Sequence, residues 1–133
     1  MTQTTIEANK RLVLDEFDEL FNKRDYNAAL RFWSPNYIQH SAHIPQGREG
    51  LFNLIRGAPA GPAIRGWADL GRGRVHDGPR QIFGQWAPRD WIAADIVRIA
   101  DDVLVEHWDV LQDEATREES QSGQPMFGTE FAP

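Results

Sequence analysis

Two stretches of alternating apolar and polar residues in the last third of the chain predict a β-hairpin. The first runs from Trp91 to Ile99 and the second from Val103 to Leu111, with a polar break over residues 100–102 between them. Strand-forming residues on both sides of a short polar break are typical of two antiparallel strands joined by a turn. We therefore expect segments 91–99 and 103–112 to pair.

The first half of the chain has helical spacing instead. An amphipathic helix of about five turns is predicted by the helical spacing of Ile6, Val13, Phe17, Leu20 and Phe21. Asp25 is a candidate cap for a second helix, Tyr26 to Trp33, and a third is expected over residues 47–56. Helices followed by strands indicate an α+β fold with the helices on one face of an antiparallel sheet.

The segments between and after these elements are less regular. Glycine and proline are frequent from residue 57 to 80, which predicts loops and short strands, and a further strand is expected over 81–86. Arginines make the 57–80 segment locally basic, which fits either a solvated loop or an anion-binding lid. In the tail, 123–133, the apolar residues Met126, Phe127 and Phe131 predict that part of the segment is ordered.

Composition narrows the class of protein. The chain has 133 residues, which is the size of a single domain over 1–133, and its 41% hydrophobic and 26% charged residues are typical of a globular protein. A net charge of −6 argues against nucleic-acid and anionic-membrane partners. Without cysteine the chain has no disulfide or thiol nucleophile. Without a signal peptide or a long apolar stretch, we expect a cytoplasmic location.

Ionisable residues interrupt the otherwise apolar hairpin. Asp95 lies in the first strand, and Glu106, His107 and Asp109 lie in the second. Alternation places His107 and Asp109 on one face together with Val105, and an odd number of loop residues would bring Asp95 to the same face. Since burying a lone charge is costly, such groups must be solvated, paired or functional.

Several short motifs, in order along nearly the whole chain, resemble one known family. They are Tyr37-Ile38-Gln39-His40, Gly47-Arg48-Glu49-Gly50, the segments 95–99 and 106–112, and Met126-Phe127. The chain resembles the SnoaL-like polyketide cyclase family, within the nuclear-transport-factor-2-like superfamily. The resemblance implies a cone-shaped α+β fold in which three N-terminal helices and a curved antiparallel sheet enclose a pocket.

The superfamily covers several activities. It includes cyclases that perform an intramolecular aldol condensation, ketosteroid isomerases, dehydratases, epoxide hydrolases and non-catalytic binding proteins, so the resemblance fixes the fold better than the reaction. It implies that Asp109 falls where the cyclases carry their acid/base aspartate. Asp95 falls near the position at which ketosteroid isomerases place a pocket carboxylic acid.

The chemistry of these residues suits carbonyl substrates. Enolisation needs a base beside the acidic carbon and a proton donor facing the developing oxyanion. Two carboxyls in a dry pocket repel as anions, so one tends to stay protonated and can donate while the other accepts. His107 and His40 are alternative donors, and Tyr37 could hydrogen-bond an oxyanion. Candidates for substrate contact are Tyr37, Phe17, Trp33, Phe52, Trp91 and Val105.

We therefore expect a cofactor-independent cyclase, isomerase or lyase that acts on a small hydrophobic carbonyl compound. The histidines of the 36–43 segment, His40 and His43, are not expected to bind a metal. Structural alternatives stay open, because Asp95 could pair with Arg98, Arg89 or an arginine of a neighbouring strand. Either His40 or His107 could only brace the fold. The other functions considered are a ligand-binding protein without turnover and a dimerisation module.

The apolar residues of the second hairpin strand also predict an assembly. Leu104, Trp108 and Val110 are expected to face outward, and Val103, Val105 and Leu111 inward. A strand with two apolar faces needs a partner on each. We therefore expect a homodimer formed through the outer face of the sheet.

Overall fold

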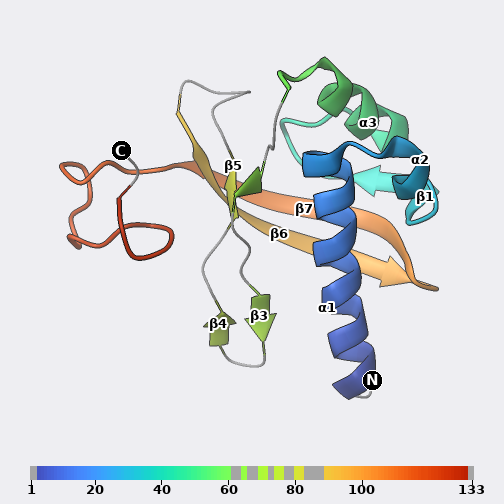
Figure 1. Cartoon of the computed structure of the whole chain (residues 1–133), viewed down its shortest axis with the longest axis horizontal. Helices are drawn as coiled ribbons and strands as arrows, with labels where there is room; N and C mark the ends of the chain where they lie inside the picture. The colour runs from blue at the N-terminus through green and yellow to red at the C-terminus, as the bar shows by residue number, and fades with distance from the viewer. Residues whose placement is uncertain are drawn as a thin grey trace. The chain divides into compact units, whose positions relative to one another are not determined.

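The structure is a computed structural model that describes residues 3–60 and 89–131, together with the backbone of four short strands between them (Figure 1). Contacts within the chain divide it into two compact units. Unit 1 comprises residues 1–62 and 95–110, and unit 2 comprises residues 63–94 and 111–133. Residues 83–86 of the predicted strand 81–86 lie outside the described residues, as do residues 61–63, 66–68, 72–73 and 77–79 of the segment 57–80.

The first helix has the predicted length. α1 (Gln3–Phe17) continues directly into a wider helical turn, η1 (Asp18–Lys23), and the buried residues of the pair are Glu16, Phe17, Leu20 and Phe21. Arg24 ends the helix in a left-handed conformation, with φ of 57°. Its guanidinium group donates to the carbonyl oxygens of Ala58 and Pro59. The end of this helix is therefore held against the segment that follows the third helix.

Glu16 is an acidic residue on the buried side of this helix. Burial, with help from Glu19 and Asp15, raises its pKa to about 7, and its Oε2 atom is buried without a hydrogen-bond partner. The folded state then holds a proton that the unfolded state releases above its ordinary pKa of 4.5. The free energy of unfolding should fall as pH rises between these two values and stay lower above them.

Glu16→Gln should therefore raise the free energy of unfolding at pH 8 by about 1–3 kcal/mol, and should change it little at pH 4.5. Urea denaturation at the two pH values measures the difference. Glu118→Gln is the matched control, since Glu118 is exposed. An equal effect of Glu16→Gln at both pH values would contradict the prediction.

The second helix is shorter than predicted. α2 covers only Tyr26–Ala29, and Asp25 caps it by accepting a hydrogen bond from Ala28 N at 3.0 Å. Trp33 belongs to the next element, β1 (Trp33–Gln39). β1 tolerates Pro35 because it lies at the edge of the sheet, and its register with its neighbour shifts between Trp33 and Ile38.

The third helix is the predicted one. α3 (Gly47–Gly57) buries Leu51, Phe52 and Ile55, and the side chain of Gln46 caps its first turn. Gly50 is required there, because a Cβ atom at this position would lie 2.6 Å from the carbonyl oxygen of Pro45. The loop before α3 is therefore packed directly onto the helix.

The predicted hairpin is confirmed. β6 (Trp91–Ala100) and β7 (Val103–Asp113) are neighbours in the sheet, and β1 lies parallel to β7 on its other side. Asp101 and Asp102 form the turn, with φ of 51° and 59°. Positive φ at both central residues is the conformation that two-residue hairpin turns favour.

The pleat of β7 is interrupted between Leu104 and His107. Both side chains are buried, at 0% and 3% exposed, although strict alternation would put residues three apart on opposite faces. The register between β1 and β7 also shifts in this region. The prediction that Leu104 faces outward is therefore wrong, because the interruption turns this side chain into the core.

The same interruption decides where Asp95 points. A two-residue turn with uninterrupted pairing would place Asp95 opposite Trp108, on the face away from Asp109. The structure instead places a carboxylate oxygen of Asp95 and one of Asp109 within 4.8 Å of each other. We infer that the interruption of the pleat in β7 has the effect that the sequence analysis assigned to an odd number of loop residues.

Aromatic rings fill the core of unit 1. The ring of Phe17 stacks on Trp33 with 5.8 Å between centroids, and Phe52 meets the edge of Trp33 at 6.0 Å. Phe17 is 3% exposed, Trp33 is 1% exposed and Phe52 is 0% exposed. The packing of these three side chains holds α1, β1 and α3 together.

Unit 2 contains the short strands and the tail. The start of β6 pairs with β5 (Arg80–Ile82), β5 pairs with β2 (Ile64–Arg65), and β3 (Asp69–Gly71) pairs with β4 (Arg74–His76), all antiparallel. In the tail, Met126 Sδ accepts a hydrogen bond from Ala115 N at 3.2 Å, and Arg117 lies 4.6 Å over the ring of Phe131. The tail thus contacts the segment that follows β7. Within the described residues, no helix is long and apolar enough to cross a membrane.

Candidate functional site

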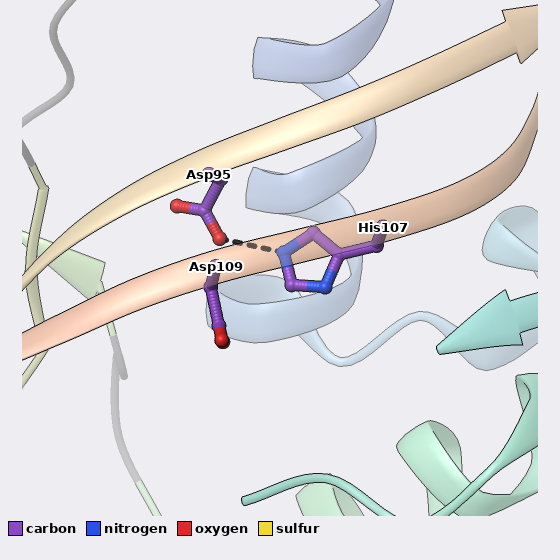
Figure 2. A group of neighbouring side chains, drawn as sticks. All are labelled: Asp95, His107 and Asp109. Carbon is purple, nitrogen blue, oxygen red and sulfur yellow. Dashed lines mark hydrogen bonds and ion pairs between the residues drawn. The ribbon is translucent and has the colours of Figure 1, made fainter. Parts of the chain in front are cut away.

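The two long strands bring three ionisable side chains together on the buried face of unit 1 (Figure 2). Asp95 comes from β6, and His107 and Asp109 come from β7. His107 Nε2 lies 2.8 Å from Asp95 Oδ1, and the side chains of this pair are only 4% and 9% exposed. One potential ligand atom from each of the three residues lies within 4.8 Å of the others. We call these residues the acidic-histidine cluster.

β1 contributes two more polar side chains to this face. Tyr37 and Gln39 are buried, and the residues that alternate with them, Ile38 and His40, are exposed. Gln39 Oε1 lies 2.8 Å from His107 Nδ1, and Gln39 Nε2 lies 3.4 Å from the Tyr37 hydroxyl oxygen. His107 is therefore held from both of its ring nitrogens.

The electrostatic setting keeps Tyr37 protonated. Burial raises the pKa of its hydroxyl well above the ordinary value, and the negative charges of Asp95 and Asp109 raise it further. A neutral phenol in this position can donate a hydrogen bond but does not act as a base near neutral pH.

His40, predicted as an alternative donor, is not part of the cluster. Its ring stacks on Trp108 with 4.7 Å between centroids, and its Nε2 donates to Glu106 Oε1 at 2.7 Å. Arg98 also donates to Glu106, and these two hydrogen bonds hold the pKa of Glu106 below its usual range. Since Glu106 and Trp108 alternate with His107 and Asp109 along β7, this network lies on the opposite face of the sheet.

The predicted substrate-contact residues fall into three groups. Phe17 touches the cluster, with its ring 6.3 Å from that of His107, and Tyr37 reaches it through Gln39. Trp33 and Phe52 are packed in the aromatic core, and Val105 is half-buried on β7. Trp91 belongs to unit 2, where its indole donates to Asp113 Oδ1 at 3.0 Å.

The structure gives each of Asp95, Arg98 and Arg89 an ion-pair partner. Arg98 pairs with Glu106, and Arg89 pairs with Glu119 at 2.9 Å. Asp95 pairs with His107. The carboxylate of Asp95 is therefore part of a buried pair with His107.

The cluster also has the donor set of a possible metal site. One imidazole and two carboxylates suit a divalent cation that accepts mixed nitrogen and oxygen ligands. Among the described residues, it is Asp95, His107 and Asp109 that offer three such ligands, and His43 is exposed and outside the group. Nδ1 of His107 already lies next to Gln39 Oε1, so Nε2 is the nitrogen left for a metal. In the structure, Nε2 is within hydrogen-bond distance of Asp95 Oδ1.

Comparison with solved structures identifies the fold. An NTF-2 like protein of unknown function from Burkholderia xenovorans LB400 superposes with a TM-score of 0.56 at 17% identity, over 80% of this chain and 85% of that one. The chain has the nuclear-transport-factor-2-like fold. No family model and no curated protein sequence matches it.

Two further proteins share this NTF2-like fold with the chain. TsrD from Streptomyces laurentii has a TM-score of 0.53 at 16% identity, over 84% of this chain and 90% of that one. AclR from Streptomyces galilaeus has a TM-score of 0.50 at 21% identity, over 79% of each chain. At these identities the likeness concerns the fold, so the chemistry has to be argued from the cluster itself.

Gln39 is the residue of this site that the sequence analysis missed. A glutamine in a strand carries no catalytic signature of its own. Alternation from Tyr37 could have indicated it, since Gln39 must share a face with Tyr37 whereas His40 must not.

Proposed function

We propose that the chain is a small-molecule enzyme that performs acid/base chemistry through an enol or enolate. Asp109 is the base that removes a proton from the carbon next to a substrate carbonyl. The electron pair of that C–H bond moves onto the carbonyl oxygen, and the Asp95–His107 pair and Tyr37 supply hydrogen-bond donors to the resulting oxyanion. Delivery of the proton from Asp109 to a different carbon of the enolate completes isomerisation. Attack of the enolate carbon on a second carbonyl, whose oxygen takes up the proton, completes aldol-type cyclisation.

A buried hydrogen-bonded pair next to a second carboxylate is the observation that supports this proposal most. Asp95 and His107 are nearly inaccessible, yet an apolar pair of similar volume would usually stabilise a core as well or better. Proton abstraction from carbon requires a proton acceptor and a proton donor placed a few ångströms apart. The resemblance of the sequence to polyketide cyclases points to the same class of reaction.

Deuterium exchange tests the proposal without a known substrate. The protein is incubated in D₂O with a panel of cyclic and aromatic ketones and β-keto esters, and loss of the α-proton signals is followed by NMR. We expect saturable exchange above the buffer rate for at least one ring-sized ketone. Line broadening without exchange would instead favour a ligand-binding protein, and neither effect with any ketone would contradict both functions.

We also propose that the chain forms a homodimer through the outer face of unit 1. This face carries Ile38, Ile96 and Val110, which are 40%, 60% and 68% exposed, beside the Arg98–Glu106 ion pair. Apolar side chains gathered on one sheet face, with a polar pair among them, are typical of a protein interface.

Light scattering at tens of micromolar protein should give twice the 15.2 kDa mass of one chain. The double variant Ile96→Glu/Val110→Glu should give the monomer mass, because dimerisation would bury the negative charges of the introduced glutamates in the interface. A monomer mass for the unmodified protein would contradict the proposal.

A further inference from the structure

The orientation of the Gln39 side-chain amide follows from its neighbours. Its Oε1 atom lies 2.9 Å from the backbone nitrogen of Ser41, and a backbone N–H can only donate. The atom that meets Ser41 must therefore be the carbonyl oxygen. The backbone of Gln39 is fixed in turn, since its N–H donates to Gln46 Oε1 at 2.8 Å.

The same oxygen determines which nitrogen of His107 carries a proton. His107 Nδ1 lies 2.8 Å from Gln39 Oε1, so Nδ1 must be protonated and donate to it. His107 Nε2 and Asp95 Oδ1 are also 2.8 Å apart. Two lone pairs at that distance would repel, so one proton lies between them, on the imidazole or on the carboxyl.

The nitrogen end of the amide orients Tyr37. Gln39 Nε2 lies 3.4 Å from the Tyr37 oxygen and can only donate to it, which occupies a lone pair of that oxygen. The hydroxyl hydrogen is then free to point to another acceptor. One amide group therefore orients both His107 and Tyr37.

We propose that Gln39 is the positioning residue of the site, which fixes His107 in the Nδ1-protonated form and so holds the shared proton at the Asp95 edge. Asp109 is then left as the base. This inference rests on the proposed function for its catalytic meaning, but the position of the proton can be measured by itself. Outer-shell partners that fix the tautomer of metal-bound histidines typically change activity by about 10–100-fold when they are removed, and we expect a loss of that size here.

NMR of protein labelled with ¹⁵N-histidine tests the assignment. Long-range proton–nitrogen correlation spectra distinguish protonated from unprotonated ring nitrogens, and a His107→Asn variant identifies the His107 signals. We expect Nδ1 of His107 to be protonated at neutral pH in the unmodified chain. An unprotonated Nδ1 would overturn the inference, whatever the activity.

Two substitutions extend the test. Gln39→Met keeps the size of the side chain but removes the acceptor, so His107 should shift toward the form protonated at Nε2. Gln39→Glu keeps an oxygen acceptor and should retain the proton on Nδ1. Gln112→Met is the matched control, since Gln112 is exposed on β7. A His107 spectrum unchanged in Gln39→Met would overturn the inference.

Activity separates this inference from the proposed function. In the ketone exchange assay, Gln39→Met should lower kcat by about 10–100-fold with little change in KM, and Gln39→Glu should recover part of the loss. Exchange that is absent in the unmodified protein would contradict the proposed function. The tautomer result would still decide the role of Gln39.

Discussion

Asp109→Asn is expected to lower the rate of ketone α-proton exchange by about 10²–10⁴-fold, the usual contribution of a positioned acid or base. The amide has the shape of the carboxyl but cannot accept a proton from carbon. Since Asp109 is only half-buried and does not join the aromatic core, the melting temperature should change little. Exchange rates by NMR and thermal denaturation measure the two effects.

Asp102→Asn provides the matched control, because the same change is made in the exposed hairpin turn, where the positive φ suits asparagine. This variant should exchange ketone protons at the unmodified rate. Normal exchange in Asp109→Asn, or loss of exchange only through unfolding, would show that Asp109 is a structural residue.

Phe52→Ala is expected to lower the free energy of unfolding by about 3–5 kcal/mol, the usual cost of removing a fully buried aromatic ring. Phe52 is 0% exposed and packs between Trp33 and Tyr26, with centroids 6.0 and 5.9 Å away. The cavity left behind would remove contacts from α2, α3 and β1 together. Chemical denaturation measures the loss.

Phe127→Ala in the tail is the control. Because Phe127 is only half-buried, this variant should lower the free energy of unfolding much less than Phe52→Ala does. The comparison also tests the expectation that Phe52 contacts substrate. A small loss of stability together with weakened ketone binding would mean that Phe52 lines a binding cavity rather than filling the core.

The elements with strong periodicity could be predicted from the sequence. The spacing from Ile6 to Phe21 gave the first helix, and the alternation around Asp101-Asp102 gave the hairpin. In both, local pattern and tertiary packing favour the same structure. The predicted end of the second helix at Trp33 was wrong, because α2 ends at Ala29 and Trp33 begins β1, an edge strand that also accepts Pro35.

The composition of the site could be predicted only in part. Asp95, His107 and Asp109 were indicated by their presence in an apolar hairpin. We infer that their common face depends on the interruption of the pleat between Leu104 and His107, which has no signature in the sequence. The role of Gln39 could not be predicted without knowing that β1 lies beside β7. That parallel pairing joins segments far apart in the chain.

His40 shows the limit of residue type as a guide. Its imidazole suggested catalysis, but its position next to Gln39 puts it on the other face, with Trp108 and Glu106. Face and neighbours, rather than residue type, decide which histidine can reach the carboxylates.

The most direct test of the acidic-histidine cluster is a double-mutant cycle in the ketone exchange assay, with Asp95→Asn, Asp109→Asn and the two combined. If the two carboxyls act as one acid/base unit, each single variant should lose most of the exchange, and the double variant should lose little more than the worse single one. Exchange at the unmodified rate in a folded double variant would contradict the account.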